Sequence, residues 1–153
     1  MICFDDDRVG DVYRTAGRTV TESDVVSVAG LSGDYNRLHV DAEFAASTPY
    51  GARIAHGLLV LSISSGLCTR LPFSEALQPN ILGLLDVNCR WPAPTRIGDT
   101  IHVLLTVTEC APTSRADRGV LPMTRETFRH DQTLVMSSQG KLRIGSRNRQ
   151  PAK

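Results

Sequence analysis

The feature that most constrains the fold is a change in the spacing of apolar residues near Pro79. Before Pro79 the apolar residues recur at helical intervals, whereas after it they alternate with polar residues as in half-buried strands. Strand patterns cover residues 85–91, 101–108, about 119–130 and 134–144. Short turns join these segments, as in antiparallel sheets. We therefore predict an α+β fold with an antiparallel sheet, not a parallel α/β fold.

The longest apolar stretch, residues 57–68, predicts a helix over about residues 56–71. Its large apolar residues fall mostly four apart, and glycines and serines fill much of the rest. Small residues let another backbone approach closely, so we expect this helix to lie against the concave face of the sheet. The stretch is well short of the ~20 residues that span a bilayer.

Two shorter helices are expected before the long one. Thr21 and Asp24 form the sequence pattern of a capping box, which predicts a helix that runs to about Leu31. Asp41 is placed to cap a second, short helix that ends before Pro49. The segment between these two helices is therefore expected to be an irregular loop.

Two features of the strand patterns predict positions in the sheet. Pro122 interrupts the third pattern, which suggests an edge strand or a bulge because proline lacks the N–H of a sheet ladder. Leu85, Val87, Cys89 and Trp91 alternate with polar residues in the first pattern, and we expect them to form part of the sheet core.

Length and composition predict one globular domain over residues 1–153, because 41% of the residues are hydrophobic and 22% charged. We expect a core over about residues 10–145 and a flexible, solvated tail at about 146–153. The formal net charge of +1 gives no reason to expect a nucleic-acid partner. The acidic amino terminus lacks a signal-peptide pattern, so we expect a cytoplasmic protein without a membrane partner. Scattered cysteines indicate reduced thiols, buried at Cys68 and Cys89.

A carboxylate and an imidazole lie five residues apart in the loop, at Asp34 and His39. On a regular helix such residues diverge by roughly 140°, so the side chains converge only if the segment is irregular. Gly33 and Asn36 supply the backbone freedom for such a loop. A carboxylate near an imidazole can hold a water molecule and exchange protons with it. A helix cap and a structural hydrogen bond are the alternative explanations of Asp34 and His39.

The sequence Gly-Asp-Tyr-Asn-Arg-Leu-His at residues 33–39, followed by Ala45, closely resembles the hydratase 2 signature of the MaoC-like enzymes. The resemblance spans about residues 20–145 in the same order and spacing. Further matching segments are residues 44–46, 54–57, 65–66, 90–94, 98–100 and 114–119. The chain is thus similar to (R)-specific 2-enoyl-CoA hydratases.

The resemblance implies a single hotdog fold, in which a curved antiparallel sheet wraps around the central helix. It implies a homodimer, with a dimer of dimers left open, and an acyl thioester of coenzyme A or acyl carrier protein as the substrate. Water addition would give an (R)-3-hydroxyacyl product, and the same site would catalyse the reverse dehydration. Coenzyme A enters as part of the substrate, and no further cofactor is expected.

The resemblance also assigns roles to particular residues. Asp34 would be the principal base, and His39 would assist it and relay the proton. The backbone N–H of Gly57, at the positive end of the central helix, would stabilise the enolate oxygen of the thioester. Asn36 would hold the catalytic loop, and Ser65 would be a polar residue facing the site.

Other polar residues have less specific expectations. Arg37 stands where the family has proline, so the loop is expected to be looser, or Arg37 to contact a substrate phosphate or carboxylate. His56 is expected to orient the entrance of the central helix by a hydrogen bond. His102 and His130 are expected to be solvated. The four histidines lack a metal-ligand spacing, so no metal site is expected.

Two other functions remain open at this point. A hotdog thioesterase would hydrolyse the thioester bond, but the Asp34 to His39 loop matches the hydratase signature. A non-catalytic acyl-binding subunit of a heterodimeric dehydratase is kept open by Arg37. Coenzyme A phosphates would need surface arginines, for which Arg53, Arg115 and Arg118 are candidates besides Arg37, although solvated surface charge explains each of them equally well.

Overall fold

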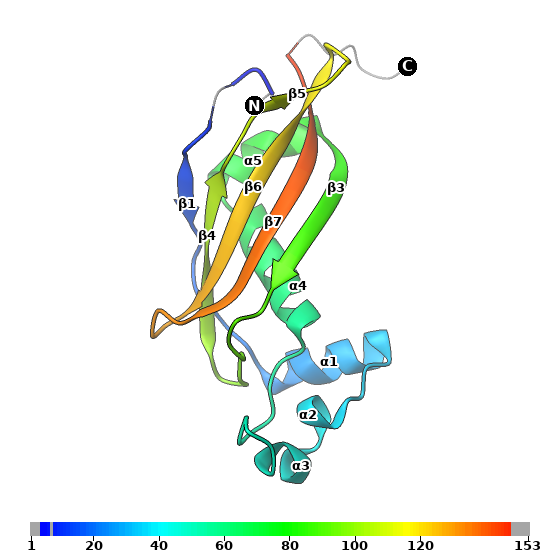
Figure 1. Cartoon of the computed structure of the whole chain (residues 1–153), viewed down its shortest axis with the longest axis vertical. Coiled ribbons are helices and arrows are strands. Elements are labelled where there is room, and N and C mark those ends of the chain that lie inside the picture. Colours follow the sequence, from blue (N-terminus) through cyan, green and yellow to red (C-terminus); the bar gives the residue numbers. More distant parts are fainter. Residues whose placement is uncertain (1–3, 7, 148–153) are drawn as a thin grey trace.

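The computed structural model describes residues 4–6 and 8–147 and contains a seven-stranded antiparallel sheet. The strand order is β1-β4-β6-β7-β3, with β2 also paired to β4 and β5 to β6. The strands are β1 (Val12–Arg14), β2 (Arg18–Thr19), β3 (Ile81–Arg90), β4 (Thr100–Val107), β5 (Ala111–Pro112), β6 (Arg118–Arg129) and β7 (Leu134–Gly145). Figure 1 shows β1 and β3 at opposite edges of the sheet. The predicted antiparallel sheet is confirmed.

Helix α4 (Gly57–Thr69) runs across one face of the sheet, followed by α5 (Pro72–Leu77) and the 3-10 turn η1 (Gln78–Asn80). Its buried side chains include Leu59, Val60, Ile63 and Leu67, which pack with inward-facing residues of β4, β6 and β7. The helix ends two residues before the predicted limit because Pro72 opens α5. A curved sheet around one central helix is the hotdog arrangement, so the predicted α+β fold is confirmed.

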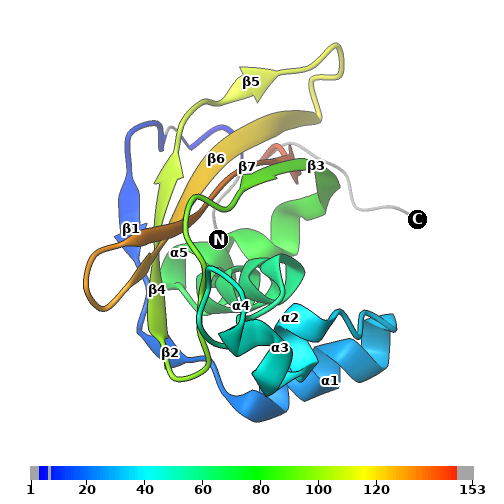
Figure 2. The ribbon, with the colours of Figure 1, turned by 60° about the horizontal axis from the view of Figure 1, so that its bottom comes forward.

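Three helices gather at one end of the sheet, beside the start of α4 (Figure 2). They are α1 (Glu22–Ser32), α2 (Arg37–Val40) and α3 (Ala42–Ala46). The expectation of one irregular loop from Asp34 to His39 is therefore wrong in part, because the loop ends at Asn36, which caps α2, and His39 lies on that helix. The predicted capping box is present, because Thr21 Oγ1 accepts from Asp24 N and the Asp24 carboxylate accepts from Thr21 N. Gly33 ends α1 with a left-handed φ of 76°. Asp41 caps α3 as predicted, accepting from Phe44 N at 2.9 Å.

The expectation that Pro122 marks an edge strand is wrong, because β6 lies between β4 and β7. The N and O atoms of one residue point to the same side of a strand, and Pro122 O accepts from Thr108 N at 3.0 Å. Thr108 follows the end of β4, and β5 begins only at Ala111. The missing N–H of Pro122 therefore faces the interruption between β4 and β5, which is why proline is tolerated in an inner strand.

The expectation that the first strand pattern belongs to the sheet core is also wrong for three of its residues. Leu85, Val87 and Trp91 are 42%, 37% and 41% exposed, and Cys89 is only half-buried. The reason is topological, because β3 is paired to β7 on one side and forms an edge of the sheet. Two register shifts, between Ile81 and Gly83 and between Leu84 and Asp86, also interrupt the regular alternation of inward and outward side chains in β3. Cys68, in contrast, is buried as predicted, and both cysteines are free thiols.

Of the tail predicted from residue 146, only Ser146 and Arg147 are among the described residues. Ser146 is buried, and Arg147 Nη2 forms an ion pair with Asp6 at 2.6 Å. The rest of the predicted tail, residues 148–153, lies outside the described residues. In the described part of the chain no single helix is long and apolar enough to cross a membrane, although α4 together with the bent segment 72–80 passes the same test as a broken pair.

Candidate active site

The loop between α1 and α2 holds Asp34 by a series of short-range hydrogen bonds. Asp34 N donates to Ser32 Oγ at 3.1 Å, and Asp34 Oδ1 accepts from Asn36 N at 3.2 Å. Such side-chain to backbone bonds fold a polar segment into a tight turn without a helix or strand. The Asp34 residue itself is exposed, so its carboxylate is open to solvent and to a ligand.

His39 lies on α2 with one ring nitrogen already engaged. Its Nδ1 is 2.8 Å from the carbonyl oxygen of Ile54. A carbonyl oxygen only accepts, so Nδ1 carries the proton and the neutral ring keeps its lone pair on Nε2. The bond to Ile54 thus fixes both the tautomer and the ring orientation of His39.

His56, directly before α4, connects this helix to the loop. Its Nε2 donates to the backbone oxygen of Asp34 at 3.0 Å, and its ring lies against that of His39 with centroids 3.8 Å apart and an interplanar angle of 30°. The expected hydrogen bond of His56 therefore exists, but it orients the Asp34 loop as well as the helix entrance. His56 Nδ1 is buried and has no hydrogen-bond partner among the described residues.

The three side chains form a compact cluster. A carboxylate oxygen of Asp34 and one ring nitrogen each of His39 and His56, atom types that could bind a metal ion, lie within 4.8 Å of one another. The sequence spacing did not predict this three-residue grouping, because His56 comes from a different segment and joins the loop only through the fold. Two acceptors this far apart can share a single water molecule, since each hydrogen bond spans about 2.8 Å.

Gly57 opens α4 beside this cluster, so its N–H belongs to the first turn, where no acceptor exists within the helix. A Cβ on Gly57 would lie 3.0 to 3.3 Å from three atoms of the Trp91 indole. Trp91 Nε1 also donates to Gly57 O at 3.0 Å. The space next to Gly57 is therefore occupied by the Trp91 ring, and sequence reasoning missed this contact by assigning Trp91 to the core.

A small cavity of about 240 Å³ opens at this point. Its lining includes His39, Gly57, Val60, Trp91 and Thr95. The cavity thus brings one of the two predicted reactive side chains next to the predicted oxyanion donor.

Asn36 and Arg37 shape the start of α2. Asn36 caps the helix, because its Oδ1 accepts from Leu38 N at 3.0 Å. Arg37 occupies the first helical position, where proline is favoured, and forms an ion pair with Asp41 at 2.9 Å. Its guanidinium also lies 4.3 Å from the Phe44 ring centre. Where proline would restrict the backbone through its ring, these side-chain contacts restrict the position of Arg37.

The ion pair with Arg37 also contributes to a lowered pKa of Asp41. Hydrogen bonds from the backbone N–H of Phe44, and then from the Arg37 side chain, hold the pKa of Asp41 below its usual value.

The other arginines considered for binding the phosphates of coenzyme A also have carboxylate partners. Arg53 forms an ion pair with Glu22 at 2.8 Å, and Arg118 and Arg115 form ion pairs with Asp117 at 2.8 and 3.3 Å.

A second, larger cavity of about 560 Å³ follows the carboxyl half of α4. Ser65 lines it, so the structure places Ser65 in this cavity and not beside Asp34. The walls are mostly apolar and come from α4, α5, β3 and the inner face of β4, β6 and β7. The residues include Leu61, Phe73, Leu84, Leu105, Met123 and Arg125.

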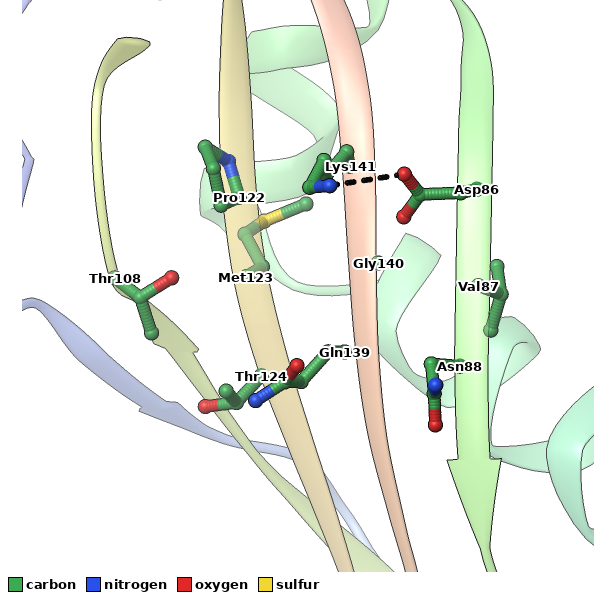
Figure 3. A pocket seen from close by; sticks show the side chains of 10 residues that line it. All are labelled: Asp86, Val87, Asn88, Thr108, Pro122, Met123, Thr124, Gln139, Gly140 and Lys141. Carbon is green, nitrogen blue, oxygen red and sulfur yellow. Dashed lines mark ion pairs between the residues drawn. The ribbon is translucent and has the colours of Figure 1, made fainter.

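A third hollow, of about 500 Å³, lies on the sheet face turned away from α4 (Figure 3). Its lining is mixed and includes the polar residues Asn88 and Gln139 and an ion pair between Lys141 and Asp86 at 3.1 Å. None of the residues that the sequence predicted for the site lines this hollow.

The other histidines are separate from the site. The expectation that His102 is solvated is wrong, because it is 7% exposed and stacks on Phe128. Burial, and then the charge of Arg14, lower the pKa of His102, which favours the neutral ring. His130 is exposed at the turn between β6 and β7, as predicted.

Comparison with known proteins identifies the family. The model of the MaoC like domain matches residues 6–123. A 3-hydroxybutyryl-CoA dehydratase from Methylorubrum extorquens is 38% identical over 119 residues, which are 77% of this chain and 71% of that protein. An (R)-specific enoyl-CoA hydratase from Rhodospirillum rubrum is 40% identical over 110 residues, which are 71% of this chain and 72% of that protein.

Solved structures agree with this assignment. A MaoC-like dehydratase from Rhodospirillum rubrum superposes with a TM-score of 0.83 at 28% identity, covering 99% of this chain and 100% of the other. An (R)-hydratase from A. caviae gives a TM-score of 0.73 at 26% identity, covering 92% and 98%. The chain belongs to the MaoC-like dehydratase family and has its hotdog fold.

Proposed function

We propose that the protein is a hydro-lyase that hydrates 2-enoyl thioesters to (R)-3-hydroxyacyl thioesters and catalyses the reverse dehydration. The observation that carries this proposal is the cluster of Asp34 and His39 beside the amino end of α4 at Gly57. Its relatives include proteins named (R)-specific enoyl-CoA hydratase and 3-hydroxybutyryl-CoA dehydratase.

The cluster provides the groups that water addition requires. Asp34 and His39 would hold one water molecule between the carboxylate and His39 Nε2. Asp34 takes one proton from this water while the oxygen bonds to C3 of the enoyl group. The same proton returns through His39 to C2, so hydrogen and hydroxyl add to one face of the double bond. The site ends in its starting protonation state.

Gly57 would act on the thioester oxygen. When the oxygen of water adds to C3, electron density moves through C2 onto this oxygen, which becomes enolate-like. The N–H of Gly57 belongs to the positive amino end of α4 and has no acceptor within the helix, so it is suited to stabilise this charge. The Trp91 indole donates to Gly57 O, so it would help to hold the backbone of Gly57 at the start of α4.

We also propose a homodimer formed along β3. This edge strand is 10 residues long and exposes Leu84, Leu85 and Val87, and an unpaired apolar edge favours pairing with another chain. Light scattering should give the mass of a dimer, and Leu85→Lys should shift it toward the monomer. A monomeric wild type would contradict this part of the proposal.

The activity is tested with a panel of 2-enoyl thioesters of coenzyme A and acyl carrier protein. Hydration removes the conjugated absorbance without releasing a thiol, whereas a thioesterase releases free thiol. We expect loss of absorbance, no thiol release and an (R)-product on chiral analysis. Thiol release would favour the thioesterase, and folded protein that acts on no substrate in the panel would favour a non-catalytic subunit.

A further inference from the structure

The cavity along α4 contains a buried positive charge. Arg125 lies on β6, faces the same side as Met123 and Thr127, and is 9% exposed. It lines the cavity among apolar side chains such as Leu61 and Phe73. A guanidinium stays protonated in proteins, so this charge is permanent. A charge in apolar surroundings requires a counter-ion or strong hydrogen bonds.

The described residues supply no counter-ion to Arg125. Within residues 4–6 and 8–147, no carboxylate forms an ion pair with it, and its Nε is buried without a hydrogen-bond partner. Asp86 pairs with Lys141 instead, and Glu126 lies on the opposite face of β6.

The two nearby thiols do not supply the missing negative charge. Burial raises the pKa of Cys68 and of Cys89. The charge of Arg125, and for Cys68 also a hydrogen bond with Arg125, acts in the opposite direction without reversing the effect. Both thiols therefore remain protonated. Among the described residues, Arg125 therefore has no negatively charged partner.

The surroundings fix the position of the guanidinium. A Cβ on Gly140 of β7 would lie 2.9 Å from Arg125 Nη1, so the absence of a side chain at Gly140 provides the space for the charge. Ser138 pairs with Arg125 across the ladder, and its Oγ is also buried without a partner among the described residues. Two polar groups with unused hydrogen-bonding capacity thus stand side by side on the inner face of the sheet.

We propose that this cavity binds an acyl chain that ends in a carboxylate, with Arg125 as the counter-ion. The inference rests on the proposed function, because the thioester must lie at Gly57 for the chain to follow α4. Ser65 and Cys68 are eight and eleven residues beyond Gly57. A rise of 1.5 Å per residue puts them roughly 12–16 Å further along the helix.

The preferred substrates are therefore 2-enoyl thioesters of dicarboxylic acids. The apolar walls accommodate the methylene groups, and the far carboxylate can accept two parallel hydrogen bonds from the guanidinium. A chain too short to reach Arg125 would leave both charges unpaired, so the preference for a carboxylate should appear only above a minimum length. This dependence on length distinguishes Arg125 from a surface arginine such as Arg37.

The test compares two series of 2-enoyl-CoA thioesters with matched chain lengths, one ending in methyl and the other in carboxylate. For wild type we expect kcat/KM for the longer chains to be higher with the carboxylate. Arg125→Met keeps an unbranched apolar stem but removes the guanidinium, and it should lower the carboxylate-to-methyl ratio by about 100-fold. Arg143→Met makes the same change at an exposed position of β7 outside the cavity and should leave the ratio unchanged.

Gly140→Ala tests the same site without removing the charge. The added methyl group should displace the guanidinium and lower the ratio by a smaller factor, which keeps the test decisive should Arg125→Met fail to fold. Binding of both series to Asp34→Asn by calorimetry gives a readout that is independent of turnover. Tighter binding of the carboxylate series that is lost with Arg125→Met supports the inference.

The outcomes separate the two proposals. Hydration of the methyl series with equal or lower activity on the carboxylate series overturns the role of Arg125 and leaves the hydratase intact. Absence of turnover in both series counts against the hydratase. In that case calorimetry decides the second proposal, and equal binding of the two series overturns it.

Discussion

The two halves of α4 present opposite environments along one helix. At the amino end, Asp34 in an exposed polar loop and the half-buried His39 on α2 lie next to a cavity of about 240 Å³. In the carboxyl half, Arg125 is buried in a mostly apolar cavity of about 560 Å³. The first site combines hydrogen bonds between near neighbours in the Asp34 loop with two longer-range bonds, from His39 to Ile54 O and from His56 to Asp34 O. The second is formed by strands and helices that are distant in sequence.

This difference separates two tasks. Reactive groups that exchange protons with water benefit from solvent access and from a loop that fixes their orientation. A group that discriminates between chain ends benefits from burial, because an unpaired charge is far more costly there than in water. Changes at the loop should therefore alter the rate for every substrate, whereas changes near Arg125 should alter the choice between substrates.

The largest effect is expected for Asp34→Asn. Loss of the proton acceptor should lower kcat by roughly 10²–10⁴ for all acyl chains. The amide keeps an oxygen that can accept from Asn36 N, so the fold should be retained, as measured by circular dichroism. Glu43→Gln makes the same chemical change at an exposed residue of α3 and should leave kcat unaltered. An active Asp34→Asn enzyme would remove the basis for the proposed mechanism.

The second effect concerns Gly57, compared as Gly57→Pro and Gly57→Ala. Both variants add the Cβ that meets Trp91, but only proline removes the N–H. Proline is tolerated at the first helical position, and His56, with φ −58° and ψ 137°, has a backbone suited to precede it. We expect kcat of the proline variant to be roughly 10²–10³ lower than that of the alanine variant. Equal values would exclude the N–H of Gly57 as the oxyanion donor.

A smaller effect is expected for Asn36→Ala, which removes the cap of α2. Loss of a helix cap costs about 1 kcal/mol, and a disturbance of that size in the loop corresponds to about fivefold in kcat. Asn36→Asp keeps the acceptor oxygen and should restore most of the activity. The ratio between carboxylate-ended and methyl-ended substrates should not move, and a change in that ratio would show that the two halves of α4 are coupled.

The smallest effect is expected for Asp24→Asn, at the start of α1. Hydrogen bonds from Arg18 lower the pKa of Asp24 from 3.8 to about 2. A lowered pKa stabilises the fold above about pH 4, and this contribution is lost as the pH falls toward 2. Asp24→Asn should lower the free energy of unfolding by on the order of 1 kcal/mol at pH 7 and by less at pH 2. Urea unfolding at both pH values measures the difference, and kcat should be unchanged.

Much of the segment from α1 to α3 could be predicted from sequence because many of its contacts are local. The capping box of Thr21 and Asp24 and the cap at Asp41 follow from residue types at fixed spacings, and both were predicted. The pairing of Asp34 with His39 followed from the resemblance to the family signature. The participation of His56 could not be read from spacing, since its bond to Asp34 O joins residues 22 positions apart.

The strand positions show the opposite case. Alternating polarity predicted where the strands lie but gave no information on their order in the sheet. The assignment of Leu85 and Val87 to the core failed because β3 lies at an edge, and the edge interpretation of Pro122 failed because β6 lies inside. Strand order depends on pairings between segments that are far apart in sequence, so a pattern of period two does not specify it.

The sequence by itself determined the long central helix, two capped helices, the four longer strands, the antiparallel α+β class and the motif that carries Asp34 and His39. These features depend on hydrophobic period, capping residues and a local motif, all of which are properties of short segments. The tertiary structure alone decided which residues share a cavity. It placed Trp91 on Gly57 and the charge of Arg125 over Gly140, because these contacts arise only when the sheet closes around α4.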